Sequence, residues 1–300
     1  MRRALELFLA AALFVATYPA YAHSGRQHYG LSVSTDDRDV ISCDQLRVSA
    51  DNRELARSED RLTLPQTSST VRVEAAENGG VYVYGWDRQD FGVLNCKVAL
   101  SDDRMTAERK LQLIKMSFDN GQLTVTGPDA SDWTSYLIVH APRGSSLALT
   151  GMNGPISVSD LAGKVEVHNT NGPFAIKGSA GEISAEIKNG PIAYAGNGGD
   201  VRLHAENGPI AVKLLGTTWN GKGLEAQSMN GPLSLKLPNN YASGVLVQAR
   251  GYSPFSCSGC EAAHKDFDDH NKSVQFGSGE PVVRLSTVNG PVSINEHDFE

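Results

Sequence analysis

A tripeptide, Asn-Gly-Pro, that recurs at fixed intervals is the feature that most constrains how this chain can fold. The first four copies are evenly spaced with a period of about 18 residues, and the two steps that follow are longer. The copies begin at Asn153, Asn171, Asn189, Asn207, Asn230 and Asn289. Between Gly154 and Gly208 a glycine also recurs at every ninth residue. A fixed internal period of this kind is typical of proteins that stack one structural unit on the next.

Each nine-residue half of the repeat contains the pattern of a short strand. After the glycine, two apolar residues are separated by one other residue, as in Ile156/Val158 and Val165/Val167. One face of each strand is therefore expected to be buried. Two strands and two glycine corners in each period make one flattened coil. We therefore predict an all-β protein, a parallel β-solenoid with about 18 residues and two strands per coil. One interior row should contain Ile156, Phe174, Ile192 and Ile210.

The residue types of the tripeptide suit a structural corner better than a ligand-binding motif. Asparagine amides at equivalent corners can form a hydrogen-bonded ladder, and proline after glycine fixes φ where one missing donor is tolerated. A coil with three strands is disfavoured, because its period would place the polar Asn171 at an inward position. A calcium-binding β-roll needs an aspartate in every turn, which these repeats lack. We expect no cofactor.

The start of the chain has the features of a secretory signal peptide. A basic Met1-Arg2-Arg3 precedes a mostly apolar stretch at 4–16, and Ala20-Tyr21-Ala22 offers small residues for cleavage after Ala22. The apolar stretch is too short to span a bilayer. The mature protein is therefore expected in the periplasm or outside the cell, with no membrane span.

Three regions are expected: a signal peptide at 1–22, an irregular β portion at 23–150, and a repeat solenoid at 151–300 with an insert at about 238–287. In the irregular portion a helix is expected near 103–113. Asn120-Gly121 resembles a degenerate repeat, and the strand at 136–144 should lead straight into the regular coils. Alternating residues predict further strands at 70–74, 80–84, 92–100 and 122–126. We find no linker, so we expect one continuous elongated unit.

The four cysteines are expected to be oxidised in an exported protein. Four thiols allow three complete pairings, of which we favour Cys43 with Cys96 and Cys257 with Cys260. The Cys257-Ser-Gly-Cys260 motif also fits a zinc half-site or a redox pair, and these two alternatives remain open beside a structural disulfide.

The outward positions of the coils supply the candidate contact surfaces. A row of small residues, Ser157, Ala175, Ala193 and Ala211, predicts a closely approached face that could meet a protein, an envelope glycan or another copy of this chain. On the opposite strands, one side chain per coil forms the row His168, Glu186 and His204. We expect a solvated, hydrogen-bonded ladder there rather than a metal site, although histidine and carboxylate groups are possible metal ligands. A formal net charge of −7 argues against a nucleic-acid partner.

Three segments together resemble the bacterial putative-adhesin domain family, a domain of unknown function found in envelope proteins. They are Val81–Gly85, Tyr136–Gly144 and the Asn-Gly-Pro-Ile-x-Val repeats, within 71–294. The resemblance implies a β-solenoid fold and a surface or envelope role, and it carries over no catalytic residues. Many relatives have aspartate where this chain has proline after Asn-Gly, so the corner chemistry differs in detail.

The favoured function is that of a non-catalytic exported solenoid, adhesin-like or an envelope scaffold, which associates through a flat surface. One alternative is an enzyme that acts on polysaccharide in a β-helical groove, which would need clustered carboxylates or basic residues on one face. The other is a periplasmic metal or redox protein that uses Cys257 and Cys260.

Overall fold

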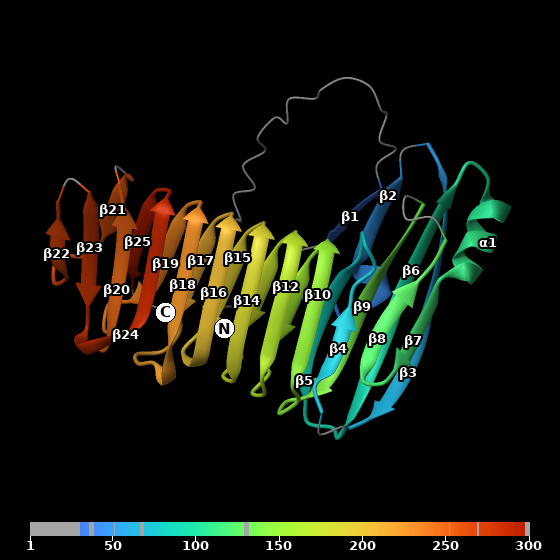
Figure 1. Cartoon of the computed structure of the whole chain (residues 1–300), viewed down its shortest axis with the longest axis horizontal. Coiled ribbons are helices and arrows are strands. Elements are labelled where there is room, and N and C mark those ends of the chain that lie inside the picture. Colours follow the sequence, from blue (N-terminus) through green and yellow to red (C-terminus); the bar gives the residue numbers. More distant parts are fainter. Residues whose placement is uncertain are drawn as a thin grey trace, which may run out of the picture.

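The computed structural model describes residues 31–35, 39–50, 52–66, 69–128, 132–251, 253–268 and 270–297. The predicted signal peptide at 1–22 lies outside these residues. Nearly all of the described chain is β-structure, arranged as a long stack of flattened coils with two main sheets (Figure 1). Within the described part, no helix is both long and apolar enough to cross a bilayer.

The two main sheets form the two broad sides of the stack. Sheet one has 12 strands in the spatial order β22 (His264–Phe267), β23 (Asn271–Phe276), β20 (Ser243–Arg250), β24 (Ser278–Asn289), β18 (Asn220–Asn230), β16 (Gly198–Asn207), β14 (Glu182–Asn189), β12 (Val165–Asn171), β10 (Leu147–Asn153), β4 (Val71–Glu74), β8 (Gln122–Thr126) and β7 (Lys115–Asp119). Sheet two has 11 strands in the order β21 (Phe255–Ser258), β25 (Val292–His297), β19 (Leu233–Pro238), β17 (Ile210–Leu214), β15 (Ile192–Gly196), β13 (Phe174–Lys177), β11 (Ile156–Ser159), β5 (Gly80–Trp86), β9 (Trp133–Pro142), β6 (Asp90–Ser101) and β3 (Glu54–Pro65).

The core consists of rows of apolar side chains that run along the stack between the two sheets. Parallel pairing places equivalent positions of successive coils opposite one another, so each repeat adds one side chain to every row. The predicted row is present and fully buried: Ile156, Phe174, Ile192 and Ile210 are each 0–1% exposed. Each such side chain contributes roughly 1.5–3 kcal/mol through burial. The predicted solenoid with two strands per coil is confirmed.

The first two coils exchange places relative to their order in the sequence. The coil of β4 and β5 pairs on one side with β10 and β11 and on the other with β8 and β9. The strand predicted at 136–144 therefore does not lead straight into the regular coils, because β9 lies one coil farther out. The connection after β9 crosses the end of β5, where the Arg143 backbone N–H donates to the Trp86 carbonyl oxygen at 3.2 Å.

The carboxyl-terminal end shows the same exchange. The segment between the last two Asn-Gly-Pro corners forms an additional coil, β20 and β21, followed by the antiparallel strands β22 and β23. β24 and β25 then return and lie between this additional coil and that of β18 and β19. The last strands of the chain thus fill a gap one coil wide.

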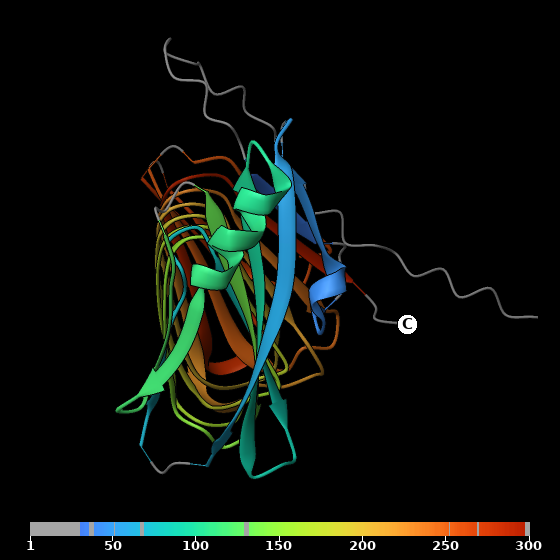
Figure 2. The same ribbon diagram turned by 90° about the vertical axis from the view of Figure 1, so that its right-hand side faces the viewer.

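Antiparallel strands and a helix cover most of the parallel edges at the two ends of the stack. β7 covers β8, and β6 followed by β3 covers β9. At the other end, β23 followed by β22 covers β20. The helix α1 (Arg104–Leu113), capped by the Asp103 carboxylate, lies across the amino-terminal end and buries Ala107 and Leu111 (Figure 2). The sequence did not indicate β3, because a polar and charged stretch from Arg57 to Arg61 interrupts any apolar alternation.

A chain truncated after Gly277 tests the role of the returning strands. Without β24 and β25, the segment from Ser243 to Phe276 loses the parallel partners of β20 and β21. We expect amide hydrogen exchange in this segment to become at least about tenfold faster, while the segment from β12 to β17 stays protected. Hydrogen exchange of the truncated and full-length chains measures this. Equal protection of the segment in both chains would contradict the stabilising role of β24 and β25.

Candidate functional site

The predicted corner asparagines form a ladder along one edge of the solenoid. In each coil the Nδ2 group donates a hydrogen bond to the Oδ1 atom of the asparagine in the preceding coil. The donor–acceptor distances are 2.8 Å from Asn171 to Asn153, 2.9 Å from Asn189 to Asn171, 3.1 Å from Asn207 to Asn189, 3.0 Å from Asn230 to Asn207 and 2.9 Å from Asn289 to Asn230. Every interior amide of the ladder therefore both donates and accepts, which fixes the register of neighbouring coils.

The ladder has one member that the sequence pattern missed. Asn153 donates to the Oδ1 atom of Asn78 at 3.2 Å, in the corner between β4 and β5. Asn78 is followed by two glycines rather than by Gly-Pro, so only its Asn-Gly dipeptide signalled a corner. The expectation for Asn120-Gly121 was wrong: these residues, with φ of 49° and 77°, form the tight turn between the antiparallel strands β7 and β8.

Close contact between coils explains the glycine of each corner. A Cβ atom at Gly172, Gly190 or Gly208 would collide with the carbonyl oxygen of the corner glycine in the preceding coil. Gly172 also has a φ of 145°, whereas Gly208 lacks a positive φ. The shared requirement is therefore space for the neighbouring backbone, rather than the backbone freedom that the sequence suggested.

Inward polar side chains beside the ladder satisfy the corner carbonyl groups. Asn169 donates to the Gly154 carbonyl oxygen at 2.9 Å. In later coils the same position is Ser228, which donates to Gly208 at 2.9 Å, and Thr287, which donates to Gly231 at 2.9 Å. These three residues were not predicted, because a polar residue at an inward position breaks the apolar alternation on which the strands were recognised.

Replacement of one ladder asparagine tests its contribution to stability. Asn189→Ala removes the hydrogen bonds that Asn189 makes with Asn171 and Asn207. We expect the free energy of unfolding to fall by about 1–2 kcal/mol, since each bond contributes roughly 0.5–1.5 kcal/mol. Urea unfolding measures the change. Thr170→Ala, at an exposed position of the neighbouring coil, is the control, and equal effects of the two changes would argue against the ladder as a stabilising element.

The outer face of sheet two is flat and carries two parallel rows of side chains. The small-residue row consists of Ser157, Ala175, Ala193, Ala211 and Ser234, which lie opposite one another in successive strands. The lysine row beside it consists of His140, Tyr84, Ser159, Lys177, Ala195, Lys213 and Lys236. Ser157, Ala175 and Ala193 are partly exposed and Ala211 is exposed. This face is open to solvent over several coils.

A covering segment, residues 39–50, lies over the amino-terminal end of this face. There the small-residue row continues into Tyr82 and Ile138, which are 7% and 0% exposed. Both pack with Val40 and Leu46 of the covering segment in a second apolar cluster, separate from the interior of the solenoid. Among the described residues, the covering segment thus covers one end of the face and leaves the rest exposed.

A disulfide and an arginine hold the covering segment in place. Cys43 is bonded to Cys96 of β6. The Arg57 guanidinium donates to the carbonyl oxygens of Leu46 and Val48, at 3.3 and 3.2 Å, which belong to β2 (Leu46–Ala50). The other edge of β2 pairs with β1 (Leu31–Thr35).

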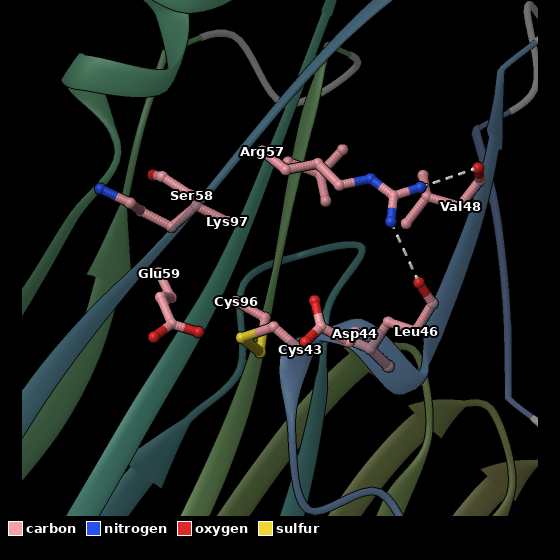
Figure 3. A pocket seen from close by; sticks show the side chains of 10 residues that line it. Cys43, Asp44, Leu46, Val48, Arg57, Ser58, Glu59, Cys96 and Lys97 are labelled. Atoms are coloured by element: carbon pink, nitrogen blue, oxygen red, sulfur yellow. Dashed lines mark hydrogen bonds between the residues drawn. A yellow bond between two sulfur atoms is a disulfide. The ribbon is translucent and has the colours of Figure 1, made fainter.

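A hollow of about 230 Å³ lies between the covering segment and sheet two (Figure 3). The disulfide, Leu46, Val48 and Arg57 line it, and Arg57 is engaged with the backbone of β2. Ser58 and Lys97 also belong to its lining, and the Lys97 ammonium lies 2.9 Å from the Asp60 carboxylate. The hollow lies along the contact between the covering segment and sheet two.

Three aromatic rings meet where the lysine row reaches β5 and β9. The His140 ring lies 5.7 Å from Tyr84 and 5.1 Å from Trp86, measured between ring centroids. The Arg88 guanidinium lies over Trp86 at 4.4 Å from the ring centroid. Burial, and secondarily the Asp39 carboxylate, raises the pKa of Tyr84 to about 12. Burial alone lowers the pKa of His140, so this histidine is neutral at pH 7.

The lowered pKa of His140 predicts a pH-dependent stability. Below pH 6.5 the unfolded chain binds a proton at this position that the folded chain resists, so stability falls as the pH falls from 6.5 through the lower folded pKa. His140→Phe keeps a ring beside Tyr84 and Trp86 but cannot titrate. We expect the variant to lose less stability than the wild type between pH 7.5 and pH 5.5. Urea unfolding at both values measures this, and parallel losses would refute the assignment.

The outer face of sheet one carries mixed charges and the row of His168, Glu186 and His204. The His168 Nδ1 atom lies 3.4 Å from a Glu186 carboxylate oxygen, and His204 occupies the next position of the same row. His168 and Glu186 are both largely exposed. Across the described residues, no three His, Cys, Asp or Glu side chains are grouped closely enough to hold a metal ion. In the adjacent row Arg202, Glu225 and Arg284 alternate in sign, which favours their stacking.

Cys257 and Cys260 form a local disulfide at the carboxyl-terminal end of the stack. Cys257 belongs to β21, the edge strand of sheet two, and the neighbouring Phe255 packs against Phe267 with 5.2 Å between ring centroids. One disulfide thus links the covering segment to β6, and the other closes a short loop in the coil at the carboxyl-terminal end of the stack. Disulfides form and persist in oxidising compartments, which indicates an extracytoplasmic location.

No family model and no curated protein matches the chain. Solved structures that match it include a putative cell adhesion protein from Clostridium sporogenes, 10% identical, with 81% of this chain and 100% of that chain covered and a TM-score of 0.37. A putative adhesin from Bacteroides fragilis is 11% identical, with 81% and 97% covered and a TM-score of 0.35. A putative lipid binding protein from Parabacteroides distasonis is 9% identical, with 80% and 96% covered and a TM-score of 0.32. The fold assignment rests on the strand pairing, to which matches at these TM-scores add nothing.

Proposed function

We propose that this protein is a non-catalytic module of the cell envelope that associates with an envelope partner through the outer face of sheet two. We further propose that a signal peptide at 1–22 directs it to the periplasm or the exterior. The observation that carries the proposal is the open small-residue row, in which Ser157, Ala175, Ala193 and Ala211 form a flat strip across four adjacent strands. Such a strip lets another surface approach the backbone closely without displacing large side chains.

The distribution of charged groups supports an association role over a hydrolytic one. Glycoside hydrolysis uses two carboxyl groups placed on either side of a bound sugar. On sheet one, by contrast, two carboxylates share one lysine. The Lys164 ammonium lies 2.8 Å from a Glu166 carboxylate oxygen and 3.7 Å from a Glu182 carboxylate oxygen. The redox alternative would use Cys257 and Cys260, which form a bond beside an edge strand rather than at the start of a helix.

A cosedimentation experiment with washed native envelope tests the proposed association. Ala193→Glu places a large side chain in the middle of the small-residue row, between Ala175 and Ala211. We expect its retention by the envelope to be at least about tenfold weaker than that of the wild type, equivalent to about 1.4 kcal/mol. Thr170→Glu introduces the same side chain at an exposed position of sheet one and is expected to leave retention unchanged. Circular dichroism confirms that both variants are folded.

Two results would refute the proposal. One is wild-type retention no higher than that of an unrelated exported protein. The other is an equal loss of retention in Ala193→Glu and Thr170→Glu, since the outer face of sheet two would then have no special role.

A further inference from the structure

The lysine row combines an aromatic end with three lysines on the same surface. Parallel pairing brings His140, Tyr84 and Ser159 side by side in β9, β5 and β11. The row then continues through Lys177 to Lys236. Seven strands about 4.8 Å apart give the row a length of about 29 Å. Its shape suits an extended chain-like ligand rather than a compact one.

The charge of this face differs from that of the protein as a whole. The chain has a formal net charge of −7. In contrast, the first two outward positions of β11, β13, β15, β17, β19 and β25 carry only serine, alanine, lysine and asparagine. Three of these positions are the lysines Lys177, Lys213 and Lys236. A cationic strip on an acidic protein favours an anionic partner at this place and disfavours one elsewhere.

The aromatic end of the row offers a surface for an uncharged ring. Tyr84, Trp86 and His140 are each partly exposed, and the first two rings lie 5.7 Å and 5.1 Å from the His140 ring. The Trp86 ring packs on Gly92, where a Cβ atom would collide with it. Aromatic rings offer an apolar body beside a polar tip, which matches a sugar ring that has apolar C–H faces and polar edges.

One carboxylate of the chain already lies in the row. The Asp39 carboxylate of the covering segment lies 4.0 Å from the Lys177 ammonium, and it is close enough to Tyr84 to raise the pKa of that hydroxyl. Ser159, which lies between these two residues in the row, is 5% exposed. Asp39 thus shows that a carboxylate fits between the aromatic end and the first lysine.

We propose that the lysine row binds a linear polysaccharide that carries carboxylates, with sugar rings on the Tyr84 end and carboxylates on Lys177 and Lys236. The inference rests on the proposed function, because it names the partner of the same face. Asp39 occupies part of the site in the free protein and competes with the carboxylates of the ligand. The covering segment therefore sets the affinity as well as stabilising the end of the solenoid.

Calorimetry with an oligogalacturonate, and with the same oligosaccharide methyl-esterified, tests the proposal. We expect the acidic form to bind at least about tenfold more tightly at low salt, with an affinity that falls as salt is added. The double change Lys177→Gln and Lys236→Gln should weaken binding about three- to tenfold, because exposed charge pairs contribute up to about 1 kcal/mol each. Lys188→Gln on sheet one is the matched control and should have no effect. Asp39→Asn should strengthen binding about two- to fivefold, which a merely structural role would not produce.

Three outcomes would overturn the proposal. The first is equal binding of the acidic and esterified forms, and the second is an equal effect of Lys188→Gln and the double change. The third is binding to phosphatidylglycerol vesicles without binding to the oligogalacturonate, which would assign the row to a lipid surface. If the oligogalacturonate fails to bind while envelope retention still depends on Ala193, the partner class is wrong and the proposed function stands.

Discussion

The backbone contact between corner glycines is the constraint on which the rest of this structure depends. Each corner glycine lies against the glycine carbonyl of the coil before it, so coils can approach to the spacing of parallel strands at every corner. At that spacing the amides of Asn171 and Asn189 come within hydrogen-bonding distance, and the interior apolar residues align into rows. A side chain at one corner would separate two coils and would disrupt the ladder and the rows together.

The same close stacking restricts what the outer faces can carry. Identical positions lie about 4.8 Å apart, so like charges in adjacent coils repel one another. Sheet one meets this restriction by alternating the sign of Arg202, Glu225 and Arg284. Sheet two meets it partly by spacing, since Ala195 separates Lys177 from Lys213. The unequal solutions give the molecule one face of mixed charge and one cationic face.

The sequence revealed those parts of the fold that repeat, and missed those that depend on long-range order. The period defined the coil, the inward row from Ile156 to Ile210 and the corner ladder, because each repeat carries the same local pattern. The period could not show that β5 lies between β9 and β11, because the pattern of a strand does not indicate which strands it pairs with. The small-residue row followed from register, whereas the cluster of Trp86 and His140 arises from a pairing between segments that are far apart in the sequence. The sequence pattern missed Asn78 as a member of the ladder, because its corner lacks the proline.

The antiparallel strands that close most of the parallel edges also determine how the molecule can assemble. A solenoid with bare parallel edges presents a template onto which a second copy can add as the next coil. Here β3 ends sheet two with exposed Glu54, Arg57, Glu59 and Arg61, and β22 ends sheet one with four exposed residues. Addition of a second copy is therefore disfavoured at β3 and at β22, whereas β21 keeps a free parallel edge.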